Sequence, residues 1–172
     1  MQDGQSKPCP VPHLLRGFEP RDRPFVSQTW VRSLADAPAY RICSPKDYFV
    51  QMQKRVDRLL ESKWVDVVLA TTPDDSDGFL GWIARAADDR DTVHMVYVKE
   101  AYRRMGLARL MVNHKRDTAR VVKATHWGKN CETIVLNKPG SMQYCPSLLR
   151  EIRHRIQPGT PVVIVKGRLP MA

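Results

Sequence analysis

One stretch, residues 92–112, constrains the fold of this chain more than any other. Residues 92–98 are apolar and β-branched with one aromatic, which predicts a buried strand. Residues 99–105 are polar and include two adjacent arginines. Apolar residues then recur at helical spacing, which predicts a helix from Gly106 to about Arg120. These apolar positions are Leu107, Leu110 and Met111.

An anion-binding site is the first function that this arrangement suggests. The free amides of a first helical turn and the helix dipole both attract negative charge. Gly106 lets a ligand come close to the backbone, and Arg103 and Arg104 add positive charge. The alternative interpretation is an ordinary strand, loop and helix whose loop is basic.

The loop also carries a family resemblance. The GNAT superfamily of N-acetyltransferases has the signature Arg/Gln-x-x-Gly-x-Gly/Ala, and the loop resembles it as Arg103-Arg104-Met105-Gly106-Leu107-Ala108. The strand before it and the amphipathic helix after it strengthen a motif that is weak alone. The resemblance implies an α/β (α+β) fold, with helices flanking a mixed, mostly antiparallel central sheet. As a whole, the chain is similar to GNAT proteins of bacteria and their phages.

The length of 172 residues suits a single domain with a full core, so we expect one GNAT domain over residues 1–172. Residues 1–10 are polar and proline-rich, and we expect them to be flexible. Gly81 indicates a bulge or a close backbone approach. Periodicity and turn residues predict a strand at 13–18, a helix at 25–36, a helix from Pro45 to about Ser62 capped by Ser44, strands at 64–71, 79–86 and 92–98, and a fifth strand ending near Trp127. Residues 129–172 resemble the family poorly.

Charge divides the chain into two unequal halves. Residues 1–98 carry 13 Lys/Arg and 14 Asp/Glu, whereas residues 99–172 carry 15 and 4, so the second half has a net charge of 15 − 4 = +11. Part of this excess suits a cofactor with a pyrophosphate and a ribose phosphate. The remainder fits an acidic protein or a nucleic acid as partner, or a generally basic surface.

Signals for export, membrane insertion and metal binding are missing from the sequence. No run approaches the ~20 apolar residues of a membrane span, and residues 1–12 lack the apolar stretch of a signal peptide. The four cysteines are scattered without a Cys-x-x-Cys pair, which indicates neither a disulfide framework nor a zinc site. We therefore expect a cytoplasmic protein with free thiols, no membrane association and no metal. The sequence leaves open whether the protein forms a homodimer.

Transfer of an acetyl group from acetyl-CoA to a primary amine is the reaction that the resemblance implies. The amine would belong to a protein, a small molecule or an aminoacyl-tRNA, and transfer would be direct. In this family the backbone of Val96, Tyr97 and Val98 would pair with the pantetheine arm as an added strand does, and one amide of that strand would polarise the thioester carbonyl. A loop would hold the pyrophosphate through its amides and charge. It consists of Arg103, Arg104, Met105, Gly106, Leu107 and Ala108.

The general acid and base are harder to assign. Members of the family usually place a tyrosine after the fifth strand as the acid, and Tyr144 is the candidate because it is the only tyrosine after Tyr102. Structural packing is the alternative role for Tyr144. His94 lies on the strand before the loop, where an ordinary histidine pKa of ~6.5 would suit a base at neutral pH. If its side chain faces the core, His94 is merely buried.

Two other functions stay open from the sequence. A GNAT fold with an atypical C-terminal part could bind the coenzyme, or only a partner, without catalysis. Alternatively, the basic half could serve a nucleic-acid-associated protein, whose binding would fall steeply with added salt.

Overall fold

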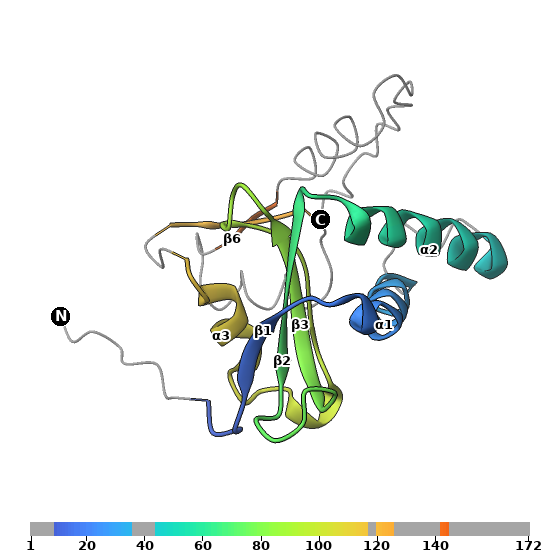
Figure 1. Cartoon of the computed structure of the whole chain (residues 1–172). Coiled ribbons are helices and arrows are strands. Elements are labelled where there is room, and N and C mark those ends of the chain that lie inside the picture. Colours follow the sequence, from blue (N-terminus) through green and yellow to red (C-terminus); the bar gives the residue numbers. More distant parts are fainter. Residues whose placement is uncertain (1–8, 36–43, 117–119, 126–141, 145–172) are drawn as a thin grey trace, which may run out of the picture.

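A six-stranded sheet forms the centre of the computed structural model (Figure 1). The structure describes residues 9–35, 44–116, 120–125 and 142–144. The strands, which lie side by side in chain order, are β1 (Leu14–Gly17), β2 (Val65–Thr71), β3 (Phe79–Ala86), β4 (Thr92–Val98), β5 (Val122–Ala124) and β6 (Met142–Tyr144). Strands β1 to β4 are antiparallel, whereas β4, β5 and β6 run parallel. The predicted mixed, mostly antiparallel sheet is therefore confirmed.

Helices cover both faces of this sheet (Figure 1). The helical elements are η1 (Pro20–Asp22), α1 (Arg23–Ala35), α2 (Pro45–Glu61), η3 (Glu100–Tyr102) and α3 (Leu107–Asn113). Helices α1 and α2 lie on one face, and α3 lies on the other. On the α1–α2 face, Trp82 is fully buried against Trp30 and donates its indole N–H to Thr29 Oγ1 at 2.8 Å. On the α3 face, Leu107 and Met111 are fully buried.

Successive side chains of β4 point to opposite faces of the sheet and so pack into two different hydrophobic clusters. Met95 and Tyr97 pack against the cluster beneath α1 and α2, whereas Val96 and Val98 pack against the cluster beneath α3. Both faces of the strand are thus covered, so its remaining freedom to interact lies along its edges.

Most element boundaries agree with the sequence. Strands β3 and β4 begin and end where they were predicted, and α1 begins two residues before the predicted residue 25. The predicted cap of α2 is confirmed, since Ser44 Oγ accepts the backbone N–H of Asp47 at 3.2 Å. Gly81 also acts as predicted, because a Cβ there would lie 2.5 Å from the Tyr97 carbonyl oxygen on β4.

Helix α3 is much shorter than predicted, so the expected helix to about Arg120 is wrong. His114 is extended and Lys115 has a φ of 53°, which takes the chain off the helical path. Beyond Lys115, both Arg116 and Arg120 lie close to Asp91 in the β3–β4 turn. The Asp91 carboxylate accepts a hydrogen bond from Arg116 Nε at 2.8 Å and lies 3.7 Å from Arg120. Periodicity could not reveal the helix end because this partner is distant in sequence.

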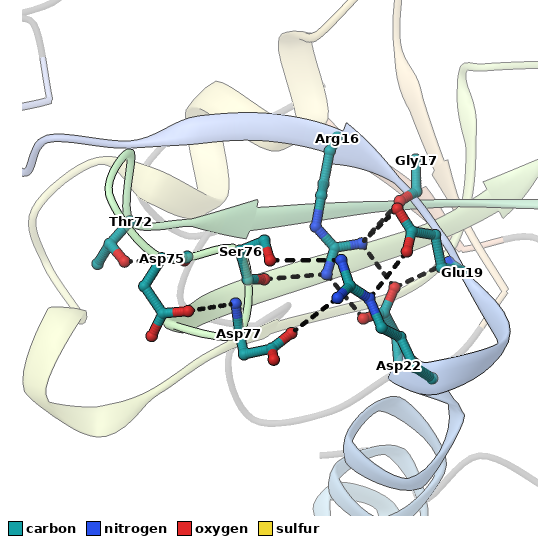
Figure 2. A network of polar contacts seen from close by, with 9 residues as sticks. Arg16, Gly17, Glu19, Asp22, Thr72, Asp75, Ser76 and Asp77 are labelled. Atoms are coloured by element: carbon teal, nitrogen blue, oxygen red, sulfur yellow. Dashed lines mark hydrogen bonds and ion pairs between the residues drawn. The ribbon is translucent and has the colours of Figure 1, made fainter.

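A network of polar contacts connects β1 and η1 to the turn of the β2–β3 hairpin (Figure 2). Asp22 is 0% exposed, and each of its carboxylate oxygens accepts a hydrogen bond from Arg16 at 2.7 Å. Arg16 also donates to the Ser76 carbonyl at 3.0 Å, and Arg21 lies 3.7 Å from Asp77. Burial acts to raise the pKa of Asp22, but the hydrogen bonds from Arg16 and the Glu19 backbone outweigh burial and lower it.

Parts of the predicted organisation lie outside the described residues. These parts are residues 1–8, the predicted strand end at Trp127, and most of residues 129–172. Cys9, from the segment expected to be flexible, is half-buried against the cluster beneath α3. From the C-terminal part, β6 is the one described element.

Candidate functional site

Strand β4 contains a β-bulge at His94. Arg85 on β3 pairs with Val93, and Ala84 pairs with Met95, so His94 is the additional residue of the bulge. Such an insertion changes which backbone groups of the following residues face each neighbouring strand.

Hydrogen bonds on either side of the bulge reveal this change. Before it, the Val93 carbonyl accepts the N–H of Thr125, just after β5, at 3.1 Å. Beyond it, the Lys99 N–H donates to the Leu80 carbonyl on β3 at 2.9 Å. The Val98 carbonyl belongs to the same peptide as the Lys99 N–H, and the two point in opposite directions. The Val98 carbonyl therefore points away from β3, toward the β5 side.

The same alternation fixes the directions of the neighbouring peptides. Val96 and Val98 direct both their N–H and C=O groups toward the β5 side, whereas Tyr97 directs its groups toward β3. The position of the Tyr97 carbonyl against Gly81 agrees with this assignment. Of the three residues expected to meet the pantetheine arm, Val96 and Val98 therefore have backbone groups on the β5 side.

Within the described residues, the β5-facing edge of β4 is open beyond the bulge. Strand β5 pairs with β4 only at Thr92 and Val93. An edge with unpaired N–H and C=O groups can accept an extended chain as an additional strand. We call the backbone groups of Val96 and Val98 on this side the open edge.

The loop after η3 is exposed and has an unusual backbone. Gly106 has a φ of 89° and Arg104 a φ of 65°, both in the left-handed region. A Cβ at Gly106 would come no closer than 4.0 Å to the atoms around it, so backbone conformation rather than packing favours glycine there. Arg104 accepts a conformation that costs a non-glycine residue about 1 kcal/mol. Strain of this kind often accompanies functional loops.

Arg103 connects this loop to the open edge. Its Nε donates to the Val98 carbonyl at 3.1 Å. No described carboxylate lies within ion-pair distance of Arg103 or Arg104. The loop therefore presents two exposed guanidinium groups beside a strand edge that can receive an extended ligand.

His94 is buried next to the open edge. Its side chain is 2% exposed, and its Nδ1 lies 3.1 Å from Thr125 Oγ1. Burial lowers the pKa of His94 to about 4, although the charge of Asp88 acts in the opposite direction. The expected ordinary pKa of ~6.5 is therefore wrong for this residue. At neutral pH His94 is uncharged, and its role as a base stays a prediction.

Tyr144 lies two strands away from this position. Val93, Ala124 and Tyr144 form one row across β4, β5 and β6. Two strand spacings place the backbone of Tyr144 about 10 Å from that of Val93. The sheet thus brings Tyr144 and His94 into neighbouring rows. The Tyr144 side chain lies outside the described part, so its role as the acid stays a prediction.

Sequence reasoning missed the residues that shape this site indirectly. The bulge at His94 has no glycine to signal it, and Thr125 is an ordinary polar residue at a strand end. Arg85 is 1% exposed and donates a hydrogen bond to the Asp66 carboxylate at 3.0 Å. It also donates to the carbonyl of His114, the residue that caps the C-terminus of α3, at 2.7 Å. An arginine within an apolar strand was the available signal for this buried role.

The described part of the chain has neither a cluster of metal-binding side chains nor a helix that could span a membrane. There, no three His, Cys, Asp or Glu side chains gather as they would around a metal ion. Its helices are too short or too polar to cross a membrane.

No family model and no curated protein matches the chain, but solved structures do. The chain is similar to apo YjaB of Escherichia coli, at 16% identity and a TM-score of 0.44, over 59% of this chain and 63% of that one. It is similar to the GNAT-family N-acetyltransferase YhbS of Escherichia coli, solved with CoA, at 23% identity and a TM-score of 0.42, over 64% and 57%. It is also similar to a GNAT-family acetyltransferase of Staphylococcus aureus Mu50, at 12% identity and a TM-score of 0.39, over 59% and 62%. The chain thus spans 57% to 63% of the length of these structures.

Proposed function

We propose that this protein is an N-acyltransferase that moves an acetyl group from acetyl-CoA to a primary amine. The observation that carries the proposal is the open edge of β4, which lies beside the exposed loop of Arg103 to Gly106. The GNAT signature in the same loop supports the assignment. An extended ligand with amides at one end and phosphates at the other matches both features.

The pantetheine arm would bind to the open edge as an added strand. Its amides would exchange hydrogen bonds with the N–H and C=O groups of Val96 and Val98. Val96 N–H is the first of these amides beyond the bulge, and it would polarise the thioester carbonyl. One such donor typically contributes a factor of about 10² to 10³ to the rate.

The pyrophosphate would lie on the loop. A glycine with positive φ lets the phosphate oxygens approach the backbone amides of residues 104–108. Arg103 and Arg104 would supply the positive charge, since no described carboxylate neutralises either of them. The loop therefore offers both the geometry and the charge that a pyrophosphate needs.

Transfer would be direct. The neutral amine attacks the thioester carbonyl carbon, the C–N bond forms, the C–S bond breaks, the amine loses a proton and the leaving thiolate gains one. We propose Tyr144 as the acid and His94, acting through water, as the base. Because its low pKa makes His94 a weak base, we expect Tyr144→Phe to reduce the rate more than His94→Gln does.

The test is release of the free thiol of CoA together with the mass of the acetylated product. Acceptors would include small amines, a lysine peptide and an aminoacyl-tRNA. Transfer by the unmodified protein, with a loss of about 100-fold in Tyr144→Phe, would support the proposal. Tight binding of acetyl-CoA without transfer to any acceptor would favour the non-catalytic alternative. A protein that binds no acetyl-CoA would contradict the acyltransferase and a non-catalytic coenzyme-binding protein, and would leave a protein that binds only a partner.

A further inference from the structure

The open edge has one acceptor that is already occupied. The Val98 carbonyl accepts a hydrogen bond from the Arg103 guanidinium at 3.1 Å, at an exposed position. The added-strand arrangement assigns this same carbonyl to an amide N–H of the pantetheine arm. A carbonyl oxygen has two lone pairs, but the Arg103 guanidinium and the pantetheine arm would both approach this oxygen from the β5 side. The two donors therefore compete for the same position on the open edge.

Only the side chain of Arg103 has to move for the ligand to take its place. The backbone N–H of Arg103 donates to the Glu100 carbonyl at 3.1 Å, which fixes the main chain at the end of η3. The side chain itself is exposed and has no described carboxylate within ion-pair distance. A phosphate bound at the loop would be a charged acceptor within the same neighbourhood, and charged acceptors bind guanidinium more strongly than carbonyls do.

We propose that Arg103 makes this site specific for ligands that carry phosphate groups as well as a pantetheine arm. Without phosphate, the guanidinium stays on Val98 and opposes docking of the arm. With phosphate, it leaves the carbonyl, and the edge becomes free. This inference rests on the proposed coenzyme site. It adds a role in specificity for Arg103, because attraction of phosphate by charge alone would not oppose binding of a ligand that lacks phosphate.

The proposal predicts opposite effects of one substitution on two ligands. Arg103→Ala should bind acetyl-CoA about tenfold more weakly, because a charged hydrogen bond to phosphate is lost. It should bind S-acetylpantetheine, which has the arm and no phosphate, about three- to tenfold more tightly, because the Val98 carbonyl is freed. Arg104→Ala is the charge-matched control: it should weaken acetyl-CoA binding but leave S-acetylpantetheine binding unchanged.

The experiment is an NMR titration of the full isotope-labelled chain, which measures dissociation constants into the millimolar range. A second titration adds saturating inorganic pyrophosphate before S-acetylpantetheine. Pyrophosphate should tighten the binding of S-acetylpantetheine by the unmodified protein, since it draws Arg103 away. It should have no such effect in Arg103→Ala. Matching amide spectra would show that the variants keep the fold.

Three results would overturn the proposal. They are equal or weaker binding of S-acetylpantetheine by Arg103→Ala, absence of any effect of pyrophosphate on the unmodified protein, and failure of every variant to bind S-acetylpantetheine. If any of these occurs while the unmodified protein binds acetyl-CoA, only the role of Arg103 is wrong. If the unmodified protein binds no acetyl-CoA, the proposed function fails and the role of Arg103 fails with it.

Discussion

The polar groups of strands β1 to β3 differ in burial and in pairing from those of the far half of β4 and the loop of Arg103 to Gly106. In the first region, Arg16 and Arg85 are largely buried and each bonds to a carboxylate within 3.0 Å. In the second region, Arg103 and Arg104 are exposed with no described carboxylate nearby, and the edge beside them is open within the described residues. The first arrangement holds the fold together, whereas the second leaves donors and acceptors available to a ligand.

The bulge at His94 marks the change between the two regions. Before it, Val93 is paired with a strand on each side. Beyond it, the backbone groups of Val96 and Val98 face the β5 side of the strand, but β5 pairs only with Thr92 and Val93 and does not extend this far. Substitutions in the first region should therefore change stability, and substitutions in the second should change binding.

Removal of the largest buried side chain of the first region should have the greatest effect on stability. Trp82 is fully buried and contacts both Trp30 and Thr29. Trp82→Ala should lower the free energy of unfolding by about 3–5 kcal/mol, measured by urea denaturation. Phe49→Ala, at a residue 45% exposed, is the control and should cost less than about 1 kcal/mol. Similar losses in the two variants would contradict the expectation that burial decides how much each side chain contributes to stability.

Loss of the buried ion pair of Figure 2 should rank second. Asp22→Asn leaves the Arg16 guanidinium without its carboxylate and should cost about 3 kcal/mol. The control from the same network is Asp77→Asn, whose side chain is 63% exposed and 3.7 Å from Arg21. That exposed pair should contribute less than about 1 kcal/mol. Equal costs would mean that burial does not decide the strength of the network.

Acidification should destabilise the protein through His94 before it does so through Asp22. Unfolded histidine binds a proton near pH ~6.5, but folded His94 does so only near its pKa of about 4. Stability should therefore fall as the pH decreases between these values, by up to about 3 kcal/mol. Asp22 has a lowered pKa, so its contribution is lost only at still lower pH, below the ordinary value of an aspartate.

His94→Gln isolates this effect in denaturation measured from pH 7 to pH 4. As the pH falls from 7 to 4, the unmodified protein should lose more stability than the variant does, because the variant lacks the histidine that gains a proton on unfolding. Because the pKa of His114 is also lowered, the variant should retain some dependence on pH. A constant difference between the two proteins across this range would contradict the buried, neutral state of His94.

A pair of proline substitutions should separate the two edges of β4 with smaller effects on stability. Tyr97→Pro removes an N–H that faces β3 and should cost about 2 kcal/mol or more. Val98→Pro removes an N–H of the open edge and should cost less than Tyr97→Pro, yet weaken acetyl-CoA binding about tenfold. Thermal unfolding and calorimetry measure the two quantities. A larger stability loss in Val98→Pro would mean that its backbone faces β3.

The sequence predicted the strands and the glycine loop of the site, but it did not predict the bulge in β4, the end of α3 or the pKa of His94. Strands β3 and β4 and Gly106 follow from local patterns, since β-branched runs and a glycine in a loop carry their own signals. The bulge at His94 and the early end of α3 depend on tertiary contacts, such as that of Asp91 with Arg116, which no local pattern encodes. For the same reason the low pKa of His94 required the structure, because burial is its main cause.

The proposed coenzyme site requires that the loop at Gly106 hold the pyrophosphate of acetyl-CoA. The most direct measurement is calorimetric binding of acetyl-CoA to the full chain and to Gly106→Glu, with Gly106→Gln as the uncharged control of equal size. Both variants share the backbone strain, but only glutamate places a negative charge at the loop. We predict tight binding by the unmodified chain, weaker binding by Gly106→Gln and none by Gly106→Glu. Equal binding by all three folded proteins, or no binding by any of them, would contradict this role of the loop.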